Sequence, residues 1–268
     1  MKDAPVISCL MVALPAASRL ERLKRSVADY ARQTWANREL VIVLNGGEPA
    51  CAAAIRAHVA TLRRDDIRVV EPAGDLPLGA LRNISRAEAA GDLICQWDDD
   101  DLYHPERLAR QAQALLGVAA EAVCLEQVMQ FFPAEGALYC DNFRGGREGC
   151  FPGSILAWRA APITYPEAGE FARLGEDTAI VLEMRERGGL KTLGDQPHLY
   201  VYVSHGANSW DEAHHRAVPH WHAQSAALVR RREAQLREGL APFAFGPGPI
   251  TVHGRNEPAF TLVEATGA

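Results

Sequence analysis

The stretch that decides the fold is Asp92-Leu93-Ile94-Cys95-Gln96-Trp97-Asp98-Asp99-Asp100-Asp101, an apolar run that ends in four consecutive carboxylates. It predicts a buried strand with an acidic carboxyl end, which is where open α/β sheets bind their ligands. Four adjacent like charges repel one another, and a divalent cation would offset that repulsion. Oxygen-only ligands suit a hard ion, so the predicted cofactor is Mg²⁺ or Mn²⁺, with substrate phosphates as further ligands. The alternative is a solvated acidic turn before the next helix.

The four carboxylates are expected to have different tasks. In an extended backbone, alternate side chains point to the same side. Asp98 and Asp100 would then both face a metal ion or a ribose. Asp99 would point away in a structural role, and Asp101 would cap the next helix.

The segments before this stretch predict a parallel sheet. Residues 6–14, 39–44 and 67–70 are short apolar runs typical of strands that are buried on both faces. Helical patterns separate them, which is the arrangement of βαβ units. Ser18 and Glu21 have the spacing of a capping box at the start of the first helix.

The second half of the chain has a different pattern. Strands are expected at 122–132, 137–143, 154–158 and 199–203, and a helix is expected to begin at Glu176. The predicted fold class is therefore α/β, with a mixed, mostly parallel sheet flanked by helices.

The chain is expected to consist of parts that share one core, without a sharp domain boundary between them. Residues 1–104 form a nucleotide-binding half and residues 105–213 an acceptor half. A polar helix at 214–240 and an extended tail to residue 268 would follow. Three leucines lie among the charges of that helix, which would pack on its own domain or in a homodimer; they are Leu228, Leu236 and Leu240.

Composition excludes several classes of protein. The 268 residues carry a net charge of −6, which argues against a nucleic-acid partner. No apolar run approaches the roughly 20 residues of a membrane span, and the N-terminus lacks a signal-peptide layout. The six cysteines have no zinc-binding spacing. We expect reduced cysteines and a cytoplasmic protein without a transmembrane segment.

Four further residues are candidate site residues. Glu176 and Asp177 at a helix start would either stabilise the helix through its dipole or supply a general base. Arg82 would contact a phosphate, pair with an Asp of the acidic stretch, or lie on the surface. His205 follows a strand and is either a third metal ligand or a hydrogen-bonded surface residue. Four other histidines are interpreted as part of a solvated helix: His214, His215, His220 and His222.

Several motifs, in this order and spacing, resemble the family 2 glycosyltransferases, which have the GT-A fold. The resemblance extends from residue 5 to about residue 210. It is carried by four segments: Gln33-Thr34-Trp35 with the strand at 39–43, Leu78-Gly79-Ala80-Leu81-Arg82-Asn83, Trp97-Asp98-Asp99-Asp100-Asp101 before Pro105, and Gly175-Glu176-Asp177.

The resemblance implies a reaction. Asp98 and Asp100 would hold a divalent cation and a nucleotide-sugar, with Arg82 and Asp99 beside them. Asp177, next to Glu176, would deprotonate the acceptor, so that an in-line displacement inverts the anomeric carbon. His205, in the segment His205-Gly206-Ala207-Asn208, resembles a histidine that reaches the metal in some members.

The expected base pocket departs from the family pattern. The usual Pro-Thr-Tyr-Asn is Pro15-Ala16-Ala17-Ser18 here, and the usual Asp after the second strand is Asn45. In relatives with a uridine donor these positions line the base pocket. A UDP-sugar is the expected donor, with the base left open, and a carbohydrate or glycoconjugate is the expected acceptor.

Two alternatives stay open from the sequence. One is a nucleotidyltransferase that forms nucleotide-sugars, although no Gly-rich, Lys-containing loop follows the first strand. The other is a non-catalytic protein that binds nucleotides or carbohydrates.

Overall fold

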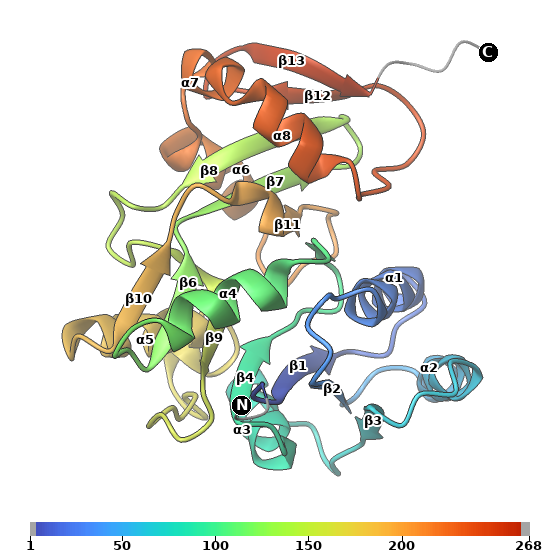
Figure 1. Ribbon diagram of the computed structural model, residues 1–268. Helices are drawn as coiled ribbons and strands as arrows, with labels where there is room; N and C mark the ends of the chain where they lie inside the picture. The colour runs from blue at the N-terminus through green and yellow to red at the C-terminus, as the bar shows by residue number, and fades with distance from the viewer. Residues whose placement is uncertain (1–3, 264–268) are drawn as a thin grey trace.

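Two β-sheets organise the computed structural model, which describes residues 4–263 (Figure 1). The first sheet has the strand order β10-β6-β9-β4-β1-β2-β3. Strands β1 to β4 run parallel, whereas β9 is antiparallel to both β4 and β6. Its strands are β1 (Ile7–Ala13), β2 (Arg38–Leu44), β3 (Ile67–Val70), β4 (Leu93–Gln96), β6 (Ala122–Leu125), β9 (Phe151–Trp158) and β10 (Leu190–Leu193).

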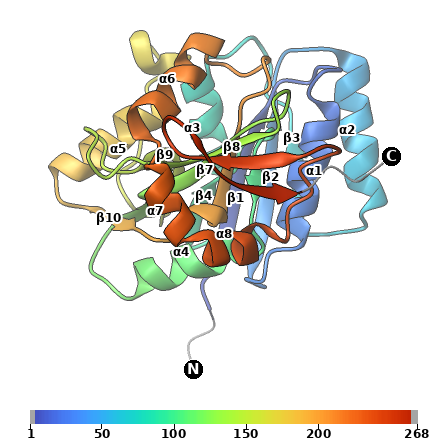
Figure 2. The ribbon, with the colours of Figure 1, turned by 90° about the horizontal axis from the view of Figure 1, so that it is seen from above.

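The second sheet has the order β13-β12-β8-β7-β11-β5. It lies above the first sheet in Figure 1 and in front of it in Figure 2. Its strands are β5 (Leu102–Tyr103), β7 (Gln127–Phe132), β8 (Ala137–Asn142), β11 (Tyr200–Val203), β12 (Ile250–His253) and β13 (Pro258–Val263).

Helices cover both faces of the first sheet, as its apolar strands require. On β1, Cys9 and Met11 pack into one core cluster with α1 and α2, and Leu10 packs into another with α3 and α5. β1 therefore buries alternate side chains on opposite faces of the sheet. The helices are α1 (Leu20–Ala31), α2 (Pro49–Thr61), α3 (Leu78–Glu88), α4 (Arg107–Leu116), α5 (Glu176–Glu186), α6 (Glu212–His222), α7 (Ala226–Arg231) and α8 (Glu233–Leu240), with 3₁₀ turns at Glu170–Ala172 and Pro197–Leu199.

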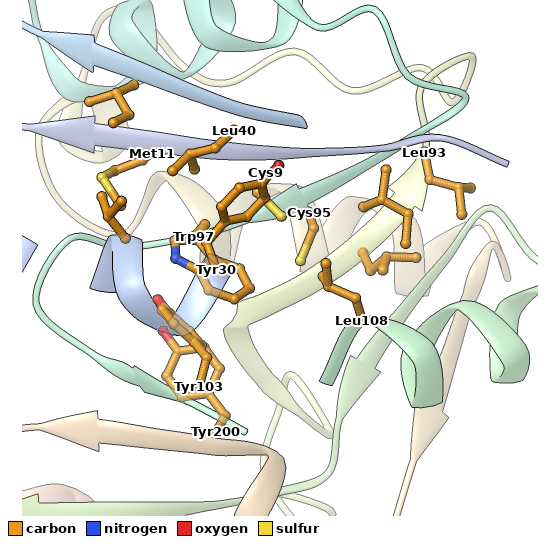
Figure 3. Close-up of a cluster of buried hydrophobic side chains, with 14 of the residues drawn as sticks. Cys9, Met11, Tyr30, Leu40, Leu93, Cys95, Trp97, Tyr103, Leu108 and Tyr200 are labelled. Carbon is orange, nitrogen blue, oxygen red and sulfur yellow. The ribbon is translucent and has the colours of Figure 1, made fainter. Parts of the chain in front are cut away.

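An aromatic stack joins the two sheets below the acidic stretch. Trp97 lies 3.9 Å from Tyr103 between ring centroids, and Tyr103 meets Tyr200 edge-on at 5.0 Å (Figure 3). The fully buried guanidinium of Arg107 lies within 5.3 Å of all three rings. Cation–π attraction is strongest where water is excluded, so this junction holds the end of β4 rigidly against the second sheet.

The predicted α/β fold is confirmed, and four local predictions are wrong. The run at 122–132 forms β6 and β7, which belong to different sheets. The predicted helix at 214–240 is three helices, α6, α7 and α8. The predicted extended tail contributes β12 and β13 to the second sheet; residues 264–268 lie outside the described part. The Ser18 side chain caps nothing, because Arg19 is the N-cap residue of α1 and makes no side-chain cap.

Two expectations from composition can be compared with the structure. All six cysteines are buried and unpaired. Within residues 4–263, no helix has both the length and the apolarity that crossing a bilayer requires.

Candidate active site

The acidic stretch follows β4 at the centre of the first sheet, and its backbone bends at residues 99–101. The predicted alternation of side chains is therefore wrong. Asp98 turns to one side, and Asp99 and Asp100 contact the same guanidinium on the other. Asp101 does not cap a helix, because it accepts hydrogen bonds from the Tyr200 hydroxyl and, at 2.8 Å, from the backbone N–H of Val203.

Arg82 of α3 connects the two predicted carboxylate pairs. Its Nη2 donates to Asp98 Oδ1 at 2.6 Å, and its Nε donates to Glu176 Oε1 at 3.1 Å. The Arg82 side chain is 7% exposed and that of Glu176 is 4% exposed. A buried charge requires close partners, so Arg82 fixes the end of β4 against the start of α5.

Arg19 supplies a second positive charge, which the sequence analysis did not identify. Its Nε and Nη2 form a fork with the two oxygens of Asp99, at 3.2 and 2.5 Å. The same Nη2 donates to Asp100 Oδ2 at 2.9 Å. β1 and β4 are parallel neighbours, so the residues that follow each strand meet at the same sheet edge. The signal in the sequence is a basic residue shortly after the neighbouring strand.

His205 shares its partner with Arg19. Its Nε2 lies 3.0 Å from Asp100 Oδ2, and its Nδ1 accepts the backbone N–H of Ala207 at 3.2 Å. Burial opposes the ionisation of Asp100, but His205 and Arg19 outweigh it and lower the pKa of this carboxyl. Burial and the charge of Asp100 raise the pKa of Asp99 to about 7. Asp100 is thus the more fully ionised of the two.

Asp177 lies at the first turn of α5, next to Glu176. Burial and the neighbouring charge of Glu176 raise its pKa to about 7, although Arg82 opposes this shift. Its Oδ1 accepts the backbone N–H of Thr178 at 2.7 Å. A carboxyl group with a pKa near 7 exchanges protons readily at neutral pH, as general bases do.

The four carboxylates of the acidic stretch, both arginines, Glu176 and Asp177 line one cavity of about 310 Å³. His205 is not among its lining residues and reaches the site through Asp100. Aromatic side chains from β9, β11 and neighbouring loops complete the wall: Phe143, Phe151, Tyr202 and Trp210. A pocket in which aromatic side chains surround convergent charged groups is a candidate ligand site.

Pro15 and Asn45 lie outside the set of residues that line this cavity. The Asn45 amide donates to the carbonyl oxygens of Pro72 and Gly74, at 3.1 and 2.8 Å. Its Oδ1 accepts the N–H of Leu76. Asn45 therefore holds the 72–76 loop in place. The Pro15 carbonyl accepts the N–H of Glu48.

The interpretation of the four histidines as a solvated group holds for His220, which is exposed, and is wrong for the other three. His214 and His222 line the cavity, and His215 is a buried residue of α6 with 3% exposure. His214 stacks on Trp210 with ring centroids 4.1 Å apart, and His222 stacks on Phe143 at 4.4 Å. The helix turns these side chains inward against the second sheet, which the local sequence pattern does not reveal.

Residues 11–135 match the sequence profile described as glycosyl transferase family 2. The match covers 125 of the 268 residues and confirms the predicted resemblance over that segment. The chain has the GT-A fold, and both findings support a glycosyltransferase. No curated protein sequence matches the chain.

Solved structures share this fold at low sequence identity. TarS 1–349 from S. aureus superimposes with a TM-score of 0.56 and 13% identity, over 88% of this chain and 70% of that chain. The mannosyltransferase PcManGT from Pyrobaculum calidifontis, in complex with GDP-Man and Mn²⁺, gives 0.56 and 17%, over 90% of this chain and 64% of that chain. TarS 1–349 in complex with UDP-GlcNAc gives 0.55 and 13%, over 88% and 71%.

Proposed function

We propose that this glycosyltransferase transfers a sugar from a nucleotide-sugar to an acceptor hydroxyl with inversion at the anomeric carbon. The observation that carries the proposal is the Arg82 bridge. It ties the carboxylates of the donor side to the helix start that presents Asp177. The nucleotide would lie in the half formed by residues 1–104 and the acceptor in the half formed by residues 105–213.

Asp177 is the proposed general base. It lines the cavity and is not tied to an arginine by a hydrogen bond within the described residues. Its raised pKa suits a group that must accept a proton near neutral pH. Glu176, held by Arg82, maintains the negative potential that keeps the Asp177 proton affinity high. Asp98, held by the same arginine, and Asp99, held by Arg19, line the cavity and are proposed to contact the donor.

A divalent cation, Mn²⁺ or Mg²⁺, is the proposed cofactor. Among residues 4–263, no three His, Cys, Asp or Glu side chains form a ready-made metal site. Asp100 Oδ2 and His205 Nε2 nevertheless converge to 3.0 Å and fit one ion as a pair. Two protein ligands are enough where phosphate oxygens and waters complete an octahedral shell. When bound, the ion would stabilise the nucleoside diphosphate as a leaving group.

The donor is proposed to be a nucleoside-diphosphate sugar, with UDP-sugars the first choice. The TarS structure is a complex with UDP-GlcNAc and the PcManGT structure a complex with GDP-Man, so donors with both bases belong in the test. The acceptor is proposed to be a carbohydrate or glycoconjugate, because aromatic side chains line the same cavity as the carboxylates.

The test incubates the protein with UDP-, GDP-, TDP-, ADP- and CMP-sugars, with and without Mn²⁺. Thermal shift reports donor binding, because a ligand that binds only the folded state raises the melting temperature. Release of the nucleoside diphosphate, or of CMP from a CMP-sugar, reports turnover, and NMR of a glycoside product reports inversion. In a parallel incubation with a nucleoside triphosphate and a sugar 1-phosphate, release of pyrophosphate would indicate nucleotidyl transfer. No thermal shift with any pair, in a folded sample, would refute donor binding.

A further inference from the structure

A closed ring of hydrogen bonds surrounds the position that a metal would share between Asp100 and His205. Arg19 Nη2 and His205 Nε2 both contact Asp100 Oδ2, at 2.9 and 3.0 Å. Ala207 completes the ring. Its N–H donates to His205 Nδ1, and its carbonyl oxygen accepts Arg19 Nη1 at 3.0 Å. Each link is of ordinary hydrogen-bond length, and the Arg19 side chain is only 15% exposed.

The ring keeps both proposed ligands in a form that does not bind a cation. Asp100 Oδ2 already has two donors, one of them a guanidinium. Because His205 Nδ1 accepts the N–H of Ala207, its Nε2 carries the proton in the neutral ring. A histidine that ligates a metal through Nε2 instead donates from Nδ1 to an acceptor. Both ligands must therefore change partners before a cation can be held.

We propose that Arg19 is an exchangeable counter-ion: it occupies the carboxylates of the donor site when no divalent cation is bound, and it leaves when one binds. The proposal rests on the proposed function only for the identity of the site. The charge balance supports it, because the bend at residues 99–101 brings two carboxylates to one guanidinium. With Arg82 committed to Asp98 and Glu176, Arg19 is the arginine that neutralises Asp100.

Departure of Arg19 would also couple the cation to the donor. The guanidinium lines the cavity, so the released positive charge stays beside the position of the diphosphate. Arg19 is thus a positioning residue, since it acts through Asp100 and His205. It also ties the 205–208 loop to the end of β4, so its departure frees that loop.

The experiment measures Mn²⁺ binding by electron paramagnetic resonance, without nucleotide, for the wild type, Arg19→Gln and Arg19→Lys. Competition predicts that Arg19→Gln binds Mn²⁺ about tenfold more tightly, since the charge-assisted contacts no longer have to be broken. Arg19→Lys keeps the charge but loses the fork, so its affinity should lie between the other two. Arg22→Gln is the matched control, because it removes one positive charge from the same helix and its hydrogen bond goes to the Ser18 carbonyl.

Equal or weaker Mn²⁺ binding by Arg19→Gln would overturn the proposal. So would the absence of Mn²⁺ binding in both the wild type and the variant, because removal of the guanidinium would then open no cation site. An equal gain in Mn²⁺ affinity in Arg22→Gln would mean that the loss of any nearby positive charge has this effect. That result would also overturn the proposal. These outcomes do not depend on turnover. Failure of the proposed glycosyl transfer is read separately, from the release of nucleoside diphosphate.

Discussion

Replacement of Arg82 by alanine should destabilise the protein far more than the loss of an ordinary surface arginine. The substitution leaves Glu176, 4% exposed, without its ion-pair partner. Breaking a buried ion pair on one side costs about 3–5 kcal/mol, because the remaining charge is uncompensated. The Asp98 side chain is 22% exposed and keeps the Gln96 amide, so it adds little to this cost. At roughly 2–4 °C per kcal/mol, the melting temperature should fall by about 6–20 °C.

The matched control is Arg56→Ala. Arg56 pairs with Glu71 on the surface, where the two side chains are 49% and 43% exposed. Exposed pairs contribute about 0–1 kcal/mol. Urea denaturation followed by circular dichroism at pH 7.5 measures both variants on one scale. The double variant Arg82→Ala/Glu176→Gln should recover part of the loss, because it removes the unpaired charge. A difference between the two single variants below about 1 kcal/mol would refute the buried-bridge argument.

Three further predictions concern proton affinity. Asp177→Asn should keep the thermal shift with the donor and lose roughly 10²–10⁴-fold in turnover; unchanged turnover would eliminate Asp177 as the base. Because this base must be ionised, kcat/KM should rise with pH below an apparent pKa of about 7 and level off above it, as a pH–rate profile in mixed buffers would reveal. Asp141 is fully buried, neither of its oxygens has a partner among the described residues, and burial raises its pKa to about 8. Since the folded state keeps a proton that the unfolded chain loses near pH 4, the stability contributed at this site falls between about pH 4 and 8, by at most about 1.4 kcal/mol per pH unit. Asp141→Asn should therefore raise the melting temperature, relative to wild type, more at pH 8 than at pH 5; an equal effect at both values would contradict the assignment.

The strands in the first half of the fold were predictable because each can be identified from its own residues. Buried parallel strands are short and apolar throughout, and turns bound them. β2 and β3 were located to within a residue on this basis. The second half lacks such marks. The run at 122–132 is apolar across the point where the chain leaves one sheet for the other, at Glu126. Local periodicity does not record which sheet a strand joins.

Candidate site residues were predictable where they lie at the ends of strands or helices. Their ion-pair partners were not predictable, because these lie far away in the sequence. The ends of β4 and β11 and the start of α5 pointed to Asp98, Asp100, His205 and Asp177. The contacts of Arg19 with Asp99 span 80 residues, and those of Arg82 with Glu176 span 94. The spacing of Ser18 and Glu21 predicted a helix cap at Ser18, and no local pattern distinguishes the neighbouring Arg19 as a site residue.

The negative charge of the acidic stretch is balanced mainly by the protein itself. Four consecutive carboxylates require nearby positive charge or hydrogen-bond donors, as predicted. The structure supplies much of it from within: Arg82 at Asp98, Arg19 at Asp99 and Asp100, and two hydrogen-bond donors at Asp101. Repulsion therefore establishes the need for positive charge but not its source. Topology supplies the source, because the parallel pairing of β1 and β4 brings the residues after one strand to those after the other. A dissolved cation at such a strand end competes with any basic residue that follows the neighbouring strand. Which of the two occupies the carboxylates depends on the difference between their binding free energies.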